Sequence, residues 1–184
     1  MKKEELLELL RKPEILKRTL RFGKFVNPES ITDLLKELLR LYGESPDEYI
    51  ILWLTTTGGS TDQGVSYYEI IRQYQPRLIT IASAGCLSAG VPMLLASEKS
   101  LRFATEQTTF LIHPTTLTFD KDDSFTESQF REKADSVAVK EQMIKNILLN
   151  ETKWSEKMIR KIKSNNLHTN VQVAQKYGLV ADIL

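Results

Sequence analysis

Residues 49–60 read YIILWLTTTGGS, and this stretch decides the fold. The run YIILWL is short and continuously apolar, which is typical of a strand covered on both faces. It leads into the pair Gly58 and Gly59, which permits a tight turn. Apolar residues at helical spacing follow over residues 65–74, and LITI at residues 78–81 predicts the next strand. A strand, a helix and a strand in this order indicate a parallel α/β unit.

The flanking sequence extends this pattern in both directions. Further strands are expected at residues 19–26, 101–103 and 109–112. Further helices are expected at residues 2–11, 28–42, 127–149, 155–163 and 171–177, and one more ending near residue 96. Gly43 is expected to end the helix of residues 28–42. The length of 184 residues suits a single domain spanning residues 1–184, with residues 1–12 as an N-terminal helical appendage.

Composition excludes several classes of function. The 25 Lys and Arg residues nearly balance the 24 Asp and Glu residues, so the chain lacks the basic excess of a nucleic-acid binder. Its longest apolar runs fall far short of the roughly 20 residues that cross a bilayer. The N-terminus mixes charges with leucine, unlike a secretory signal, and a cytoplasmic location is expected. One cysteine, Cys86, and two histidines cannot form a disulfide or a Cys/His zinc site, so we expect no metal and no cofactor.

Ser88 is a candidate nucleophile. It follows the strand expected at residues 78–82 and stands in a G-x-x-S-x-G pattern from Gly85 to Gly90, which differs from the G-x-S-x-G elbow of α/β-hydrolases. At the start of a helix, free N–H groups and the helix dipole would stabilise developing negative charge. The alternative is structural, because serine is also a favoured helix N-cap.

Two further features carry the same ambiguity. His113 ends the apolar strand of residues 109–112, where it could act as a general base or form a hydrogen bond at the sheet edge. The amides of Gly58 and Gly59 could face a ligand, or the pair could simply form a tight turn. His168 lies in the polar residues 163–170, expected as a solvated loop, and receives no role.

Three ordered motifs resemble the Clp protease proteolytic subunit family, serine peptidases with a crotonase-like fold. The glycine turn of residues 54–60 is similar to the family's strand and glycine turn. Residues 84–90 are similar to its serine turn, and Leu111-Ile-His113 to its strand end. The intervals between these motifs suit the family without gaps. The closing Tyr177-Gly-Leu-Val180 is also similar.

The resemblance implies a mostly parallel α/β sheet with flanking helices and a long protruding handle helix, within a handle region of about residues 120–150. It makes Ser88 the nucleophile and His113 its general base. The backbone N–H groups of Gly59 and Ala89 would form the oxyanion hole.

The family's third catalytic residue, an aspartate, has no counterpart. Counting without a gap puts Ile162 at its position, and no acidic residue stands between Arg160 and Val180. The amide oxygen of Asn165 or Asn166 could instead accept the histidine's N–H, as an asparagine does in Cys-His-Asn peptidases.

The favoured hypothesis is therefore a serine endopeptidase that hydrolyses unfolded polypeptides inside an oligomeric chamber. The resemblance implies a heptameric ring or double ring, fed by an ATP-dependent AAA+ unfoldase. Independently, apolar residues on more than one face of the helix at residues 130–149 predict a homo-oligomer. The alternative is a catalytically impaired structural or regulatory ring subunit. A third possibility is a crotonase-fold enzyme acting on acyl-CoA thioesters. No nucleic-acid or membrane partner is expected.

Overall fold

A mostly parallel sheet forms the centre of the protein, in a computed structural model that describes residues 1–116, 124–164 and 166–184. Its strands are β1 (Thr19–Phe22), β2 (Ile50–Thr56), β3 (Leu78–Leu87), β4 (Arg102–Ala104), β5 (Thr109–Ile112), β6 (Leu167–Asn170) and β7 (Asp182–Ile183). Parallel neighbours run in the order β1-β2-β3-β4-β7, and β5 also pairs in parallel with β3. The described strands are antiparallel where β6 joins β5. The mostly parallel sheet predicted from the sequence is confirmed.

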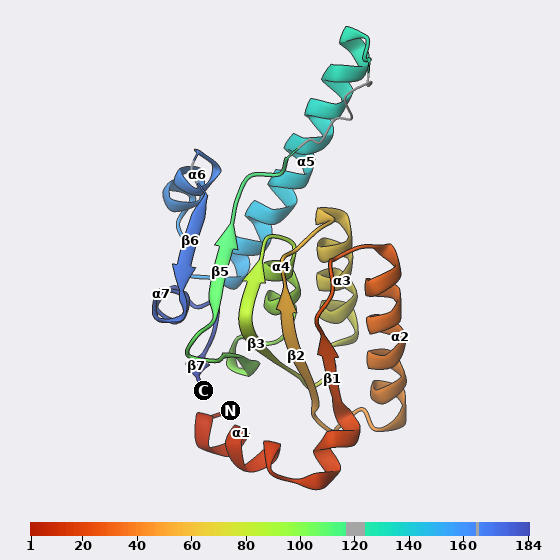
Figure 1. Cartoon of the computed structure of the whole chain (residues 1–184), viewed down its shortest axis with the longest axis vertical. Coiled ribbons are helices and arrows are strands. Elements are labelled where there is room, and N and C mark those ends of the chain that lie inside the picture. Colours follow the sequence, from red (N-terminus) through yellow and green to blue (C-terminus); the bar gives the residue numbers. More distant parts are fainter. Residues whose placement is uncertain (117–123, 165) are drawn as a thin grey trace.

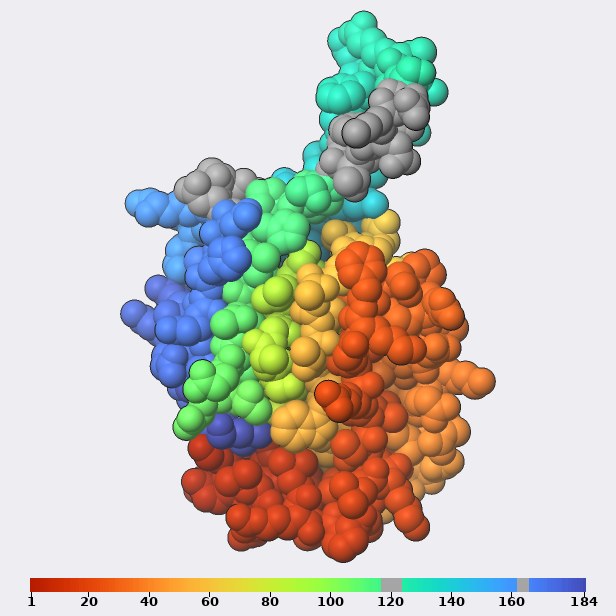
Figure 2. Space-filling model, viewed as in Figure 1, coloured from red at the N-terminus to blue at the C-terminus, as the bar shows by residue number. Residues whose placement is uncertain are grey.

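Helices cover this sheet and extend from it (Figure 1). They are α1 (Lys3–Leu10), α2 (Pro28–Glu44), α3 (Thr61–Tyr74), α4 (Gly90–Leu95), α5 (Glu127–Glu151), α6 (Glu156–Ser164) and α7 (Val171–Lys176), with short 3₁₀ turns at Pro13–Arg18 and Lys99–Leu101. The long helix α5 projects away from the body, and its first turns stand clear of it (Figure 2). This helix was predicted within a handle region of about residues 120–150, of which 120–123 lie outside the described residues.

Strand β2 is buried on both faces, as its unbroken apolar run predicts. Ile50, Leu52 and Leu54 are fully buried in a large apolar cluster with α2, α3 and α4. Ile51 points the other way, into a smaller cluster with Leu6 of α1. Alternating side chains therefore bury apolar surface against helices on both sides. This accounts for a strand that carries no polar residue until Thr55.

Strand β3 is longer than predicted. On one side β3 pairs with β2 from Leu78 to Cys86, and on the other side residues 80–82 pair with β4 and residues 85–87 pair with β5. Ala84 lies between the pairings with β4 and with β5 and has a φ of +58°. The strand thus bends and changes partners where the sequence suggested that it gives way to a helix. The small residues Ala84 and Gly85 lie at this bend.

The predicted end of α2 at Gly43 is wrong. The helix continues through Gly43 to Glu44, and the N–H of Ser45 still donates to the carbonyl of Leu41. Ser45 then leaves the helical region with φ −154° and ψ +86°. Pro46 follows, and a residue that precedes proline is disfavoured in the helical conformation. The proline, not the glycine, accounts for the end of the helix.

The solvated loop predicted at residues 163–170 is also wrong in part. Leu167–Asn170 form β6, in which His168 stands opposite Leu111 and Thr169 opposite Phe110. Thr169 is buried and His168 is exposed. An edge strand with one solvated face tolerates polar residues, so composition alone suggested a loop.

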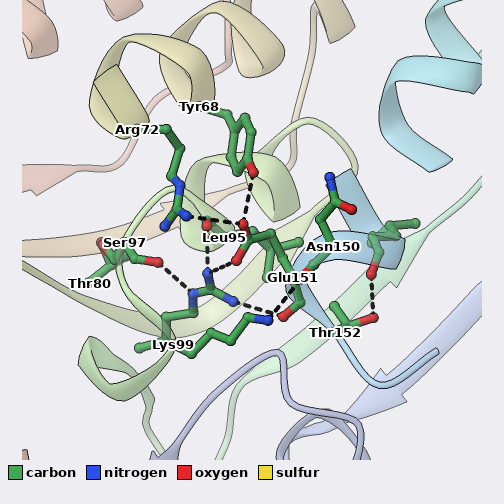
Figure 3. A network of polar contacts seen from close by, with 11 residues as sticks. Tyr68, Arg72, Thr80, Leu95, Ser97, Lys99, Asn150, Glu151 and Thr152 are labelled. Carbon is green, nitrogen blue, oxygen red and sulfur yellow. Dashed lines mark hydrogen bonds and ion pairs between the residues drawn. The ribbon is translucent and has the colours of Figure 1, made fainter. Parts of the chain in front are cut away.

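A buried ion pair fixes the last turn of α5 (Figure 3). The fully buried guanidinium of Arg102, on β4, pairs with the carboxylate of Glu151. The hydroxyl of Tyr68 donates a second hydrogen bond to that carboxylate, at 2.9 Å. Burial by itself raises the pKa of Glu151, but the hydrogen bonds from Arg102 and Tyr68 outweigh it and hold this pKa below its ordinary value of 4.5.

The variant Glu151→Gln removes this charge and leaves the Arg102 guanidinium buried without its counter-ion. We expect the free energy of unfolding near neutral pH to fall by about 3–5 kcal/mol. Because a lowered pKa stabilises the folded state above the unfolded pKa, the gap between wild type and variant should shrink as the pH falls below about 4.5. Urea denaturation at stepwise lower pH measures the gap, and a gap that stays constant would contradict the assignment.

Candidate active site

Ser88 and His113 meet at one edge of the sheet. The last paired residues of β3 and β5 are Leu87 and Leu111, which stand opposite each other in parallel strands. The residues that follow the two strands, Ser88 and the segment ending in His113, therefore lie at the same carboxyl-terminal edge of the sheet. There the hydroxyl of Ser88 lies 2.8 Å from Nε2 of His113, within hydrogen-bond distance.

The backbone of Ser88 is not that of a helix cap. Its φ is +54°, a left-handed conformation that costs a serine on the order of 1–3 kcal/mol. The N-cap of α4 is Ala89, and no side chain caps this helix. The N–H of Ser88 donates instead to the carbonyl of Leu111, at 2.8 Å. The structural reading of Ser88 as a helix cap is therefore wrong, since its hydroxyl contacts the imidazole.

The imidazole of His113 is held by its own neighbour in the chain. Its Nδ1 lies 2.7 Å from the carbonyl oxygen of Pro114. A carbonyl can only accept, so Nδ1 carries the proton in this contact. In the neutral ring, Nε2 is then the acceptor and faces the hydroxyl of Ser88. The backbone thus selects the tautomer that a general base requires.

Hydrogen bonds from neighbouring residues fix the glycine turn after β2. Gly58 and Gly59 have φ values of +94° and +146°, which favour glycine. On either side of Gly59, the N–H of Val26 donates to Gly58 and the N–H of Ser60 donates to Val26, each at 2.8 Å. The hydroxyl of Thr56 accepts from the N–H of Gly58 at 3.0 Å. The pair forms a tight turn, and Gly59 also lines the cavity of the site.

The amides of Gly59 and Ala89 remain available for a ligand. Within residues 1–116, 124–164 and 166–184, the structure records no hydrogen-bond acceptor for either N–H. Both residues line the cavity that also contains Ser88 and His113. Two free backbone donors beside a hydroxyl and an imidazole can stabilise an oxyanion.

The cavity beside these groups has a volume of about 240 Å³. Its apolar lining residues include Val91, Pro92, Ile112, Ile144, Leu148 and Ile159. Lys140 and Lys145 of α5 also line it, and each is paired with a carboxylate of a neighbouring helix. Such a cavity suits an apolar side chain of a ligand.

The structure separates the two candidates for the third catalytic residue. Asn165 lies outside the described residues. Asn166 is exposed, and continuing the β5–β6 register by one residue places it opposite His113. The described contact of Nδ1 is with Pro114, which sequence reasoning missed because a backbone carbonyl carries no residue signature.

The described residues contain no group of three or more His, Cys, Asp or Glu side chains that could hold a metal ion. Among the helices of the described ranges, none is both long and apolar enough to span a membrane. Cys86 is buried two residues before Ser88, and burial raises the pKa of its thiol.

The variant Gly58→Ala tests the packing of the turn against Ser88. A Cβ on Gly58 would lie 2.6 Å from Cβ of Ser88 and would also require φ +94°. We expect a loss of about 1–3 kcal/mol in the free energy of unfolding and a longer Ser88–His113 contact. Denaturation and a crystal structure measure the two effects.

The matched control is Gly23→Ala, because a Cβ there meets nothing within 4 Å. It should change the free energy of unfolding by no more than about 0.5 kcal/mol. Equal effects of the two variants would contradict the close approach of Gly58 to Ser88.

Comparison with known proteins places these features in a family. The family model described as Clp protease matches residues 6–184. The ATP-dependent Clp protease proteolytic subunit 3 of Frankia casuarinae is 28% identical over 172 residues, which cover 93% of this chain and 79% of that protein. The ATP-dependent Clp protease proteolytic subunit of Dehalococcoides mccartyi is 26% identical over 167 residues, covering 91% and 82%.

A solved structure has the same fold. It is a mutant of ClpP1 from Listeria monocytogenes, which matches with a TM-score of 0.81 at 24% identity and covers 97% of this chain and 95% of that one. The fold expected from the motifs is thereby confirmed. With a family match that extends over nearly all of its length, this chain belongs to the Clp protease family.

Proposed function

We propose that this chain is a serine peptidase subunit that hydrolyses peptide bonds of unfolded polypeptides inside an oligomeric chamber. The observation that carries the proposal is the 2.8 Å contact of Ser88 with His113 beside two free backbone amides. Membership of the Clp protease family supports the same reaction. A paired nucleophile and base also favours hydrolysis over the thioester chemistry of other crotonase-like proteins.

In this proposal, Ser88 attacks the carbonyl carbon of the scissile peptide while Nε2 of His113 takes its proton. The protonated imidazole then gives that proton to the leaving amine, which departs and leaves an acyl group on Ser88. Water, activated by the same imidazole, hydrolyses the ester and restores the serine. The apolar cavity holds an apolar substrate side chain next to the reacting carbonyl.

The N–H groups of Gly59 and Ala89 bind the oxyanion in each tetrahedral intermediate. Each such donor is typically worth about 2.7–4 kcal/mol in turnover. The Val26 pairing and the Thr56 hydroxyl hold the turn that presents Gly59. The donors are therefore in place before the substrate binds, which is the condition for a large effect.

The third catalytic group is neutral in this proposal. The carbonyl of Pro114 orients the imidazole, and Asn166 is the residue that the β5–β6 register, continued by one residue beyond Ile112 and Leu167, would place opposite it. Neither group carries the negative charge that stabilises an imidazolium ion. Turnover should therefore be slower than that of a site with a carboxylate. If turnover is negligible, the chain would instead serve as a structural ring subunit, which is the alternative function.

We further propose a homo-oligomer, in the heptameric ring or double ring that the family resemblance implies. Phe130, Val139 and Met143 are large apolar residues exposed on α5, and a partner subunit would cover them. The relatives named above are ATP-dependent, which supports an AAA+ unfoldase as the partner that delivers substrate.

The variant Ser88→Ala should lower kcat for a short peptide with an apolar residue at the cleavage site by about 10⁴-fold or more. The variant Ser83→Ala is the matched control, because this serine lies earlier on β3, where it bonds Thr55. Initial rates of peptide cleavage by the assembled proteins measure the effect of each variant, and Ser83→Ala should keep the wild-type rate. Equal rates for wild type and Ser88→Ala would exclude the catalytic role, and a wild type without activity would favour the structural ring subunit.

The variant Asn166→Asp should raise kcat by about tenfold or more, because a carboxylate opposite His113 stabilises the imidazolium better than a neutral oxygen. His168→Asp is the control, since it adds a carboxylate opposite Leu111 instead. The pH profile of kcat measures the effect. An unchanged kcat in Asn166→Asp would show that this side chain does not reach the imidazole.

A further inference from the structure

The ion pair of Arg102 and Glu151 joins the ends of two helices. Arg102 donates from Nη2 to the carbonyl of Leu95 and from Nε to the carbonyl of Ser97, both at 2.8 Å. It also donates from Nη1 to the backbone carbonyl of Glu151, in addition to the contact with its carboxylate. One buried guanidinium therefore binds the end of α4 and the end of α5.

A third helix joins the same carboxylate. The Tyr68 hydroxyl donates to Oε1 of Glu151 at 2.9 Å, and Nη2 of Arg72 lies 3.6 Å from that oxygen. Both residues belong to α3 and point toward Glu151 in Figure 3. Helices α3, α4 and α5 thus share one polar network.

These three helices also supply walls of the cavity beside Ser88. Thr61 begins α3, Val91 lies in the first turn of α4, and Ile144 and Leu148 lie on α5. The network lies at or beyond the C-terminal ends of α4 and α5. The cavity lies at the start of α3 and α4. The network therefore holds the helices that form these walls at points away from the cavity itself.

Helix α5 is held by partly exposed ion pairs of Lys140 with Asp62 and of Lys145 with Glu156, and by the buried residues of its last turns. Its described buried residues are Ile147, Leu148 and Glu151, all in the last two turns. Of these, Glu151 makes the directional contacts, because apolar packing alone allows a helix to slide or rotate. Because partly exposed ion pairs contribute little, the position of Ile144 and Leu148 in the cavity wall depends chiefly on these last turns, where Glu151 makes the buried polar contacts.

We propose that Arg102 and Glu151 are positioning residues that set the width of the peptide-binding cavity by fixing α4 and α5 against α3. This proposal rests on the proposed peptidase function of that cavity. Neither residue takes part in the chemistry, so weakening the network changes how well an apolar substrate side chain is held, while the Ser88–His113 pair keeps its geometry.

The test compares Glu151→Gln and the milder Tyr68→Phe with wild type, using a short peptide with an apolar residue at the cleavage site. We expect KM to rise about tenfold and about threefold respectively, with kcat changed less than about twofold. A small fluorophosphonate, which does not fill the cavity, should label Ser88 at the wild-type rate in both. Tyr68→Phe removes one hydroxyl, so it keeps the test decisive if Glu151→Gln does not fold.

The matched control is Glu127→Gln, the same substitution on α5 at an exposed ion pair with Arg131. It should leave KM unchanged. An unchanged KM in folded Tyr68→Phe, or a common fall in kcat and labelling rate, would overturn the positioning role. If wild type neither cleaves the peptide nor reacts with the probe, the proposed function fails instead. Calorimetric titration of the same peptide then decides the positioning role, which predicts weaker binding in Tyr68→Phe and is overturned by equal affinity.

Discussion

The parallel pairing of β3 with β5 is the constraint on which the candidate site depends. The three register positions from Gly85 to Leu87 align the ends of the two strands, so that Ser88 and His113 leave the sheet side by side. A shift of this register by one residue would move every side chain on β5 to the other face. The bend at Ala84 makes the pairing possible, because it lets β3 leave β4 and continue along β5.

Around this pairing, the site is assembled mainly from backbone groups. The oxyanion donors are the amides of Gly59 and Ala89, and the group that orients the imidazole is the carbonyl of Pro114. Backbone groups hold their positions through the secondary structure on either side of them, so no extra side-chain entropy is lost in ordering them. The arrangement also explains how a chain without an acidic residue between Arg160 and Val180 can still fix the tautomer of its histidine.

Much of this could be predicted from the sequence. The apolar run before Gly58 indicated a strand buried on both faces, because its burial leaves a direct mark in the residue types. Ser88 and His113 could be named from their motifs, and the structure brings them together. What could not be predicted depends on contacts between distant segments. Strand β6 looked like a loop because it exposes one polar face, and the ion pair of Glu151 with Arg102 joins residues 49 positions apart, which no local pattern indicates.

The central claim is that a hydroxyl, an imidazole and two amides converge on one reacting carbonyl. A crystal structure of the assembled protein after reaction with a fluorophosphonate tests it most directly. The account predicts phosphorus bonded to the oxygen of Ser88, with the phosphonyl oxygen about 2.7–3.1 Å from the amide nitrogens of both Gly59 and Ala89. An unmodified Ser88, or an adduct whose phosphonyl oxygen faces away from these amides, would contradict it.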